Sequence, residues 1–494
     1  MNYLFSITSG ILLGLIFPKF NLFHLAWIAL VPLLIAIYRT DSLKSAFVYG
    51  LMAGLFFFGI NTSWVTVLSD WVGPLSFLAW ILLTIYQALY LGAFAFLLNL
   101  QLTTYNLQLF AVPALFVVLE WLRSLGLFGV TGGGLGYSQW TNLPLIQIAS
   151  LTGVYGITFL IVLVNVSITE FFLRRKRGQL FLVLALLLMV YLYGFNQLTT
   201  YNLRLTAYNL KVATIQGNIP QKMKMDYRFN DYVTQVHEDL TRQATLEKPN
   251  LIIWPETTVL IYPTLNSVYF SKIKNLAVES RSDLIFGTPY FEQGKIYNSA
   301  LAISSSGETL NRYDKYQLVP FGEYLPFRPI VYPFLKSYPL FAVDYNTNPK
   351  QEVLKITKAK IGTVICFEST FPYLVRDKIK KGADFILVIT NDAWFKDSDA
   401  AYQHLSFASL RAVENRTYVV QVANTGLSAI IDPCGRILAK TNLNERVILL
   451  GKIYFRKPET FYSKYGEVAV YFSLIILTGV ILIRLFPLGT FHLR

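Results

Sequence analysis

The sequence predicts a protein of two parts, an α-helical membrane domain of eight transmembrane helices and a globular α/β domain inserted before the last helix. Three observations predict this class. The chain has 494 residues, which is more than one ordinary domain. Its residues are 54% hydrophobic and only 15% charged, a composition typical of membrane proteins. Long apolar segments fill roughly the first 200 residues, whereas short strand-like runs dominate the region that follows.

Each long apolar segment is about the length that a helix needs to cross the hydrocarbon core of a bilayer, although the first two are marginal. The predicted spans are Tyr3–Phe17, Leu22–Tyr38, Ala46–Val67, Leu75–Leu98, Leu109–Leu125, Val154–Leu173, Leu180–Tyr193 and Val468–Phe486. The first span lacks the basic flank and the small-residue cleavage site of a signal peptide, so we expect it to be retained.

Basic residues in the loops predict the orientation of these spans. They follow spans two and six and flank span eight, at Arg39, Lys44, Arg174–Arg177, Arg484 and Arg494. Because cytoplasmic loops carry the excess of lysine and arginine, both termini are predicted to be cytoplasmic. The predicted division is then residues 1–200 for the membrane domain, 205–464 for an extracytoplasmic domain, and 465–494 for the eighth span with a cytoplasmic C-terminus.

The loop between spans five and six is rich in glycine, from Gly129 to Trp140. Glycine allows close backbone approach, and Tyr137 and Trp140 suit the membrane interface. Two interpretations stay open for this loop, a flexible connector or a part of the mouth of a site.

The region 205–464 combines strand-like runs with helical stretches and hairpins. The expected strands are Lys211–Gln216, Asn250–Trp254, Asp283–Gly287, Ile361–Cys366, Asp384–Ile389 and Thr417–Ala423. The expected helices are Tyr232–Leu246, Leu265–Ser280 and His404–Asn415, and the expected hairpins lie at Ala300–Leu310 and Ser428–Leu438. This alternation predicts mixed sheets with helices on their outer faces, two such layers forming a sandwich.

Charge and cysteine content exclude several kinds of site. The net charge of +14 would suit nucleic acid, but the chain has no RNA- or DNA-binding motif, so we assign the charge to topology and anionic headgroups. The two cysteines, Cys366 and Cys434, could form one disulfide if both face an oxidising compartment. They make no disulfide framework and no zinc site, and we expect neither a metal nor a cofactor. Cys434 lies in the hairpin turn Asp432–Gly435, where we expect an exposed, inert turn residue.

The stretch Ile361–Thr370 is the main candidate for chemistry, because a buried strand there ends on Cys366. Most cysteines outside disulfides are inert core residues, and alone this one would be no exception. Three further stretches carry ionisable residues near strand ends. Leu251–Thr258 leaves Glu256 at the tip of a strand, Asn311–Pro326 carries Lys315 and Glu323 in a loop bounded by proline and glycine, and Ile389–Phe395 closes the strand after the cysteine. A cysteine nucleophile needs a base for its proton and a positive charge for the oxyanion, and these residue types supply both.

Several motifs together resemble a known family. Trp254-Pro255-Glu256, Tyr313-Asp314-Lys315 and Cys366-Phe367-Glu368 look like the Glu-Lys-Cys triad of the nitrilase, or carbon-nitrogen hydrolase, superfamily. The membrane frame and the motifs Gln216–Gln221, Val319–Pro326 and Asn391–Phe395 narrow the resemblance to the bacterial apolipoprotein N-acyltransferases, over nearly the whole chain.

The resemblance implies an αββα sandwich outside the cytoplasmic (inner) membrane, carried on eight helices. It implies acyl transfer from a phospholipid, commonly phosphatidylethanolamine, to the free amine of a lipoprotein's diacylglyceryl-cysteine. By motif, Glu256 matches the base, Lys315 the oxyanion-stabilising lysine and Cys366 the thioester nucleophile. The positions that match supporting site residues are Glu323, Glu368, Tyr324, Asn298 and Trp394. In addition, the backbone N–H of Phe367 is expected to help hold the oxyanion. The family often has a tryptophan where this chain has Met225, which puts aromatic stacking on lipid in question there.

Two rival functions follow from the same residues. A membrane-tethered amidase would use the same triad with water as the acceptor, and the eight-span frame argues against it because a hydrolase does not need that frame. A transporter with a large external domain is the less favoured rival, because transporter spans usually hold ionisable residues and these hold few.

Overall fold

A computed structural model describes residues 1–100, 108–201, 209–350, 352–455 and 459–485. Phe486 and Arg494, and the start of the predicted globular domain at residue 205, lie outside the described residues. The chain forms two compact units. The first comprises Met1–Ser69, Pro74–Gln197 and Tyr465–Arg494, and the second comprises Asp70–Gly73 and Leu198–Lys464.

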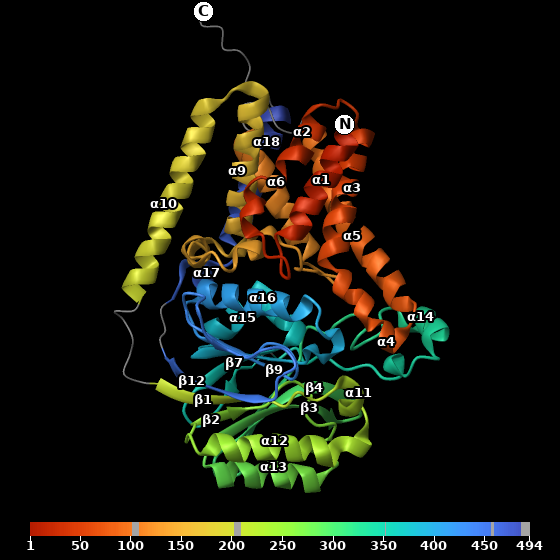
Figure 1. Cartoon of the computed structure of the whole chain (residues 1–494), viewed down its shortest axis with the longest axis vertical. Coiled ribbons are helices and arrows are strands. Elements are labelled where there is room, and N and C mark those ends of the chain that lie inside the picture. Colours follow the sequence, from red (N-terminus) through yellow and green to blue (C-terminus); the bar gives the residue numbers. More distant parts are fainter. Residues whose placement is uncertain (101–107, 202–208, 351, 456–458, 486–494) are drawn as a thin grey trace, which may run out of the picture. The chain divides into compact units, whose positions relative to one another are not determined.

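The first unit is helical, and a helix lies at each segment in which a span is predicted (Figure 1). These helices are α1 (Asn2–Leu15), α2 (Val31–Tyr38), α3 (Leu43–Asn61), α5 (Leu75–Asn99), α6 (Gln108–Arg123), α9 (Val154–Arg174), α10 (Arg177–Tyr201) and α18 (Val468–Leu485). Five helices of the described residues are long and apolar enough to cross a membrane, namely α3, α5, α9, α10 and α18. The second predicted segment is not one continuous helix, because a short 3₁₀ turn at Phe23–Trp27 precedes α2 and Pro32 lies in the first turn of α2.

Small residues bring helices of this unit into close contact. A Cβ added at Gly50 of α3 would lie 2.3 Å from the Leu91 carbonyl oxygen of α5, and one at Gly54 would lie 2.7 Å from the Ala88 Cα. Only glycine allows these two backbones to approach so closely. Such contacts are typical of helix packing in membranes, where dispersion forces and not the hydrophobic effect drive association.

The glycine-rich loop is anchored inside the first unit by buried polar groups. The Glu120 carboxylate accepts a hydrogen bond from the Leu135 backbone N–H at 2.9 Å and one from the Thr158 hydroxyl at 2.8 Å. The Thr158 hydroxyl in turn accepts from the Gly136 N–H at 3.0 Å, and the Arg123 guanidinium donates to the Gly132 carbonyl. Residues Leu135–Gln139 are buried, which does not fit the interpretation as a flexible connector.

The second unit contains two six-stranded sheets, ordered β12-β1-β2-β3-β4-β5 and β11-β10-β9-β8-β7-β6. The strands of the first sheet are β1 (Asn209–Gln216), β2 (Leu251–Ile253), β3 (Asp283–Glu292), β4 (Lys295–Ile303), β5 (Thr309–Asp314) and β12 (Val447–Tyr454). Those of the second are β6 (Leu354–Lys355), β7 (Lys360–Ile365), β8 (Phe385–Thr390), β9 (Val419–Ala423), β10 (Ala429–Ile431) and β11 (Ile437–Lys440). All six predicted strands and both hairpins are present; β6 and β12 are additional.

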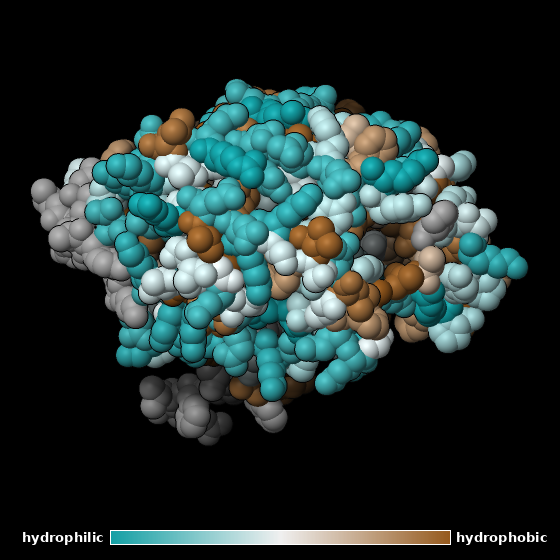
Figure 2. Space-filling view, turned by 90° about the horizontal axis from the view of Figure 1, so that it is seen from below, coloured by the Kyte–Doolittle hydropathy of each residue, from teal (hydrophilic) through white to brown (hydrophobic). Residues whose placement is uncertain are grey.

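The two sheets pack face to face. One apolar core contains side chains from both, including Val212 and Ile285 of the first sheet and Leu387 and Val420 of the second. Helices α12 (Asn230–Thr245) and α13 (Ser267–Ser280) cover the outer face of the first sheet, and α15 (Pro372–Lys380) and α16 (Ala400–Asn415) cover that of the second (Figure 1). The α12–α13 face is mostly hydrophilic, as solvent contact requires (Figure 2). The predicted sandwich is therefore confirmed as an αββα arrangement.

The prediction for Cys434 is wrong. Its side chain is 0% exposed, although it lies in the turn between β10 and β11. The Asp432 carboxylate accepts a hydrogen bond from the Cys434 backbone N–H at 2.8 Å, and the Arg416 guanidinium lies 3.7 Å from the sulfur. The turn is folded inward onto buried polar groups, which a turn motif in the sequence does not reveal. Cys434 and Cys366 both lie in the part of the chain that the structure describes, and no disulfide joins them.

Candidate active site

Cys366 lies at the carboxyl end of β7, where the chain turns sharply into a 3₁₀ turn at Cys366–Thr370. Its φ angle is +52°, a left-handed conformation that costs free energy for a residue with a Cβ. Residues Ile361–Ile365 are buried and hold the strand in the sandwich, whereas Cys366 is only partly buried. The strained turn therefore presents the thiol at the edge of the sheet.

Glu256 lies just after β2, in a turn that packs against the neighbouring strand β3. Gly287 of β3 makes this possible, since a Cβ there would lie 2.6 Å from the Glu256 Cα and from the Pro255 carbonyl oxygen. The Gly287 N–H donates to the Pro255 carbonyl at 3.1 Å, and the Thr258 N–H donates to the Gly287 carbonyl at 2.8 Å. The turn is thus fixed on both sides, and the Glu256 side chain is buried.

Lys315 follows the end of β5 and is 1% exposed. Its Nζ lies 2.9 Å from a Glu323 carboxylate oxygen and 3.5 Å from a Glu256 oxygen. Burial alone would lower the pKa of Lys315, but the Glu323 and Glu256 carboxylates raise it above its ordinary value. The site therefore holds a permanent, dehydrated positive charge.

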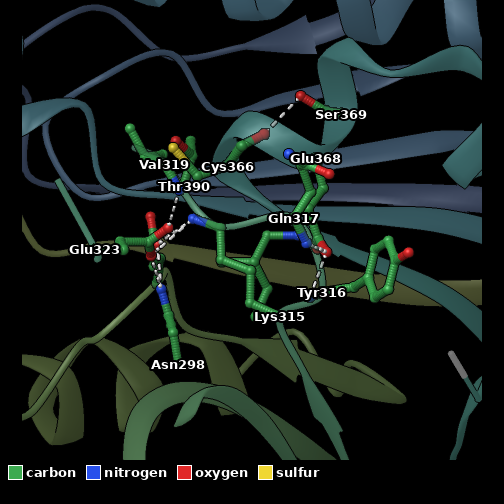
Figure 3. Close-up of polar contacts among 12 residues, drawn as sticks. Asn298, Lys315, Tyr316, Gln317, Val319, Glu323, Cys366, Glu368, Ser369 and Thr390 are labelled. Carbon is green, nitrogen blue, oxygen red and sulfur yellow. Dashed lines mark hydrogen bonds and ion pairs between the residues drawn. The ribbon is translucent and has the colours of Figure 1, made fainter. Parts of the chain in front are cut away.

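Asn298 and Glu323 complete the surroundings of the lysine (Figure 3). The Asn298 amide donates to Glu256 at 2.7 Å and to Glu323 at 2.8 Å, so this one side chain bridges the two carboxylates. The second Glu323 oxygen accepts from the Val319 N–H at 2.9 Å. Lys315 and these hydrogen bonds offset the repulsion of two carboxylates in one buried site.

Glu368 is fully buried and joins the Cys366 turn to the Lys315 loop. Its carboxylate accepts from the Ile365 N–H at 2.7 Å, the Tyr316 N–H at 2.7 Å and the Gln317 N–H at 3.1 Å (Figure 3). It also accepts from the Tyr313 hydroxyl at 2.9 Å. Burial raises the pKa of Glu368, and these backbone donors oppose that rise. The residue thus fixes the position of the nucleophile's turn relative to the lysine.

The thiol of Cys366 is held in its neutral form. Burial, followed by the negative charge of Glu256, raises the pKa of Cys366 well above its usual range, while Lys315 and a hydrogen bond from Thr390 oppose that rise. Figure 3 shows Thr390 beside the sulfur and the Lys315 amine directed toward the same space. A thiol in this setting reacts only if a neighbouring base removes its proton.

Two other predicted residues are close in sequence to these groups. Phe367 follows the nucleophile, and its ring packs edge-to-face on Phe371 with centroids 4.9 Å apart. Tyr324 follows Glu323, and its carbonyl accepts from the Phe321 N–H at 2.8 Å. Burial raises the pKa of Tyr324.

Trp394 lies in the 3₁₀ turn Asp392–Phe395, which follows β8. Its ring centroid lies 5.0 Å from that of Trp71, which belongs to the same unit. Among the described residues, the Trp394 indole donates no hydrogen bond to a carboxylate of the site.

Sequence reasoning did not single out Lys224, which is buried beside the site. Its Nζ donates to the Glu256 carbonyl oxygen at 2.7 Å, and burial lowers its pKa to about 7. It lies three residues beyond the motif Gln216–Gln221, and a lysine in a short polar stretch gives no sign of burial. Among the described residues no group of histidine, cysteine and acidic side chains could hold a metal ion.

Comparisons with known proteins cover both units. Residues 9–167 match the family described as apolipoprotein N-acyltransferase N-terminal domain, and residues 211–456 match the carbon-nitrogen hydrolase family. The chain is 38% identical over 484 residues to the apolipoprotein N-acyltransferase of Geobacter metallireducens, covering 94% of this chain and 92% of that one. It is 32% identical over 448 residues to the apolipoprotein N-acyltransferase of Aquifex aeolicus, covering 90% of this chain and 96% of that one. With matches of this length and identity, the chain belongs to the apolipoprotein N-acyltransferase family.

Proposed function

We propose that the protein transfers an acyl chain from a membrane phospholipid to the N-terminal amine of S-diacylglyceryl-cysteine on apolipoproteins, through a thioester on Cys366. The observation that carries the proposal is the buried Lys315, held by Glu256 and Glu323 next to a cysteine on a strained turn. These groups supply a base, a fixed positive charge and a nucleophile, the three requirements of acyl transfer through a thiol.

In the first half-reaction Glu256 takes the thiol proton and the Cys366 sulfur attacks the ester carbonyl of the phospholipid. The Lys315 ammonium stabilises the oxyanion, together with the backbone N–H of Phe367, which is the second residue of the 3₁₀ turn Cys366–Thr370 and so has no helical partner. The carbon–oxygen bond of the ester then breaks. Protonated Glu256 returns the proton to the lysophospholipid, and the acyl chain stays on the sulfur.

In the second half-reaction the α-amine of diacylglyceryl-cysteine attacks the thioester. Glu256 takes a proton from the amine, the carbon–sulfur bond breaks, and Cys366 is released as a thiol once it regains that proton. One carboxylate thus serves both steps, and the exchange is ping-pong. Asn298, Glu323 and Glu368 position the three reacting groups, and Tyr324 and Trp394 lie in the loops that meet the substrates.

The membrane arrangement belongs to the same proposal. Eight helices carry the protein in the cytoplasmic membrane, with both termini in the cytoplasm and the catalytic domain on the outer, periplasmic side. Five helices of sufficient length support the location in a membrane, and the basic cluster Arg174–Arg177 supports this orientation. Phosphatidylethanolamine is the proposed acyl donor. The membrane frame holds the thiol at the bilayer surface, where the donor ester lies.

The test is a product analysis with the full chain in detergent micelles, supplied with phosphatidylethanolamine and a diacylglyceryl-cysteine lipopeptide. We expect a lipopeptide heavier by one acyl chain, identified by mass spectrometry. The same lipopeptide with an acetylated amine is the matched control and should gain nothing. Release of free fatty acid with an unchanged lipopeptide would instead identify a hydrolase and contradict the proposal.

A further inference from the structure

Three polar residues near Cys366, namely Thr390, Asp392 and His404, belong to the second sheet and to the turn and helix that follow its strand β8. Thr390 ends β8, Asp392 begins the 3₁₀ turn that follows, and His404 lies in the second turn of α16. Thr390 is 0% exposed, and the side chains of Asp392 and His404 are 1% and 12% exposed. None of the three has a role in the acyl transfer described above.

Hydrogen bonds connect these residues to the sulfur. The His404 Nδ1 lies 2.7 Å from an Asp392 carboxylate oxygen, and the Thr390 hydroxyl donates to the same oxygen at 3.1 Å. Thr390 also lies beside the Cys366 sulfur (Figure 3), and a hydrogen bond from Thr390 opposes the rise in the pKa of that thiol. A threonine hydroxyl has one proton, so it donates either to Asp392 or to a thiolate at Cys366.

The Asp392 carboxylate is buried against the backbone of Gly426. A Cβ added at Gly426 would lie 2.1 Å from the second Asp392 oxygen, so only glycine fits there. That oxygen is buried and has no hydrogen-bond partner among the described residues. A buried carboxylate is costly unless a cation compensates it, and His404 is the group in contact with it.

We propose that the Asp392–His404 pair, acting through Thr390, sets the reactivity of the Cys366 thiol. Protonated His404 neutralises Asp392, which leaves the Thr390 proton available to the thiolate. Without that charge, Asp392 competes for the Thr390 proton and repels the thiolate. Asp392 and His404 are therefore positioning residues that favour the step in which Cys366 loses its proton.

The charges that face these groups agree with this assignment. Glu256 and Asp392 raise the pKa of Cys366 after the larger effect of burial, and Lys315 lowers it. The charge of Lys224 also interacts with both Cys366 and Asp392. The charges of two lysines and two carboxylates thus act on the thiol. Whether the charge of Asp392 is neutralised decides how strongly the second sheet disfavours the thiolate.

The charges around His404 also agree with the proposal. Burial would lower the pKa of His404, but the Asp392 charge and the hydrogen bond to it raise the pKa above its ordinary value. Glu256 raises it further and Lys315 lowers it. The pair with Asp392 therefore favours the imidazolium form of His404, which is the state that the proposal requires.

The experiment measures alkylation of Cys366 by iodoacetamide against pH, in the full chain in detergent, with the site identified by mass spectrometry. Alkylation needs the thiolate but no acyl transfer, so it tests this inference separately from the proposed function on which it rests. We expect His404→Gln to slow alkylation about tenfold and to move its pH profile upward, since a lone carboxylate this close shifts a pKa by about one unit or more. Asp392→Asn should not slow alkylation, and the double variant should behave like Asp392→Asn.

The different effects expected for His404→Gln and Asp392→Asn distinguish the loss of a charge from a general disturbance of the structure. His237→Gln is the matched control, because His237 is also a shielded histidine, 1% exposed, but its Nδ1 lies 2.8 Å from a carbonyl oxygen, that of Val233, and not against a carboxylate. It should leave the profile unchanged. If both single variants slow alkylation and their effects add in the double variant, the inference is wrong. Should His404→Gln fail to fold, Thr390→Val must slow alkylation while Thr390→Ser, which keeps the hydroxyl, must not.

Discussion

Replacing Cys366 with serine is expected to lower acyl transfer by about 10³-fold or more while the protein stays folded. A serine hydroxyl is far less acidic than a thiol, and Glu256 cannot make an alkoxide of it near neutral pH. The side chains have nearly the same shape, and Cys366 is only partly buried, so the midpoint of thermal unfolding should not change. Transfer to the lipopeptide and the unfolding midpoint are measured on the same preparation.

Cys434→Ala is the control for the loss of a thiol. This residue is buried in the turn between β10 and β11 and lies outside the site. The folded fraction of that variant should transfer acyl chains at the normal rate. A Cys366→Ser protein that acylates the lipopeptide as fast as the original would show that transfer does not pass through this sulfur.

Replacing Lys315 with methionine is expected to abolish transfer and also to destabilise the second unit. Methionine fills a similar volume but leaves Glu256 and Glu323 buried without their cation. Breaking a buried pair by removing one partner costs about 3–5 kcal/mol. The loss of activity has a separate cause, since the oxyanion loses its fixed positive charge. The measurements are the midpoint of thermal unfolding and the transfer rate of the folded fraction.

Lys381→Met provides the matched control. Lys381 forms an ion pair with Asp377 at 2.8 Å, and both side chains are 41% exposed. An exposed pair of this kind contributes about 1 kcal/mol or less, so the midpoint should hardly change. If Lys315→Met unfolded no more easily than Lys381→Met, the two carboxylates would not depend on the lysine for their burial.

The strands and the principal site residues could be predicted because each lies in a local pattern. Apolar β-branched runs such as Ile361–Ile365 mark buried strands, and Glu256 and Cys366 each lie just after such a run. Lys315, which the sequence places in a loop, instead follows the polar strand β5, which has no such run. The structure brings Lys315 to Glu256 and Glu323, and a single amide, that of Asn298, contacts both carboxylates.

Features that depend on contacts between distant segments could not be predicted. Gly287 allows the Glu256 turn to pack closely, but a lone glycine in a strand does not say what will approach it. Cys434 is buried because its turn folds inward, and turn residues usually predict exposure. Asp392 and His404 lie 12 residues apart and meet because α16 packs against the 3₁₀ turn Asp392–Phe395 that follows β8.

The most direct test of the account is to incubate the protein with phosphatidylethanolamine alone, without lipopeptide, and to analyse its peptides by mass spectrometry. We expect one acyl chain on the peptide that contains Cys366, removable by hydroxylamine as a thioester is, and transferable to lipopeptide added afterwards. Full transfer activity in a protein that never shows this adduct would contradict the thioester mechanism and indicate direct transfer between the two lipids.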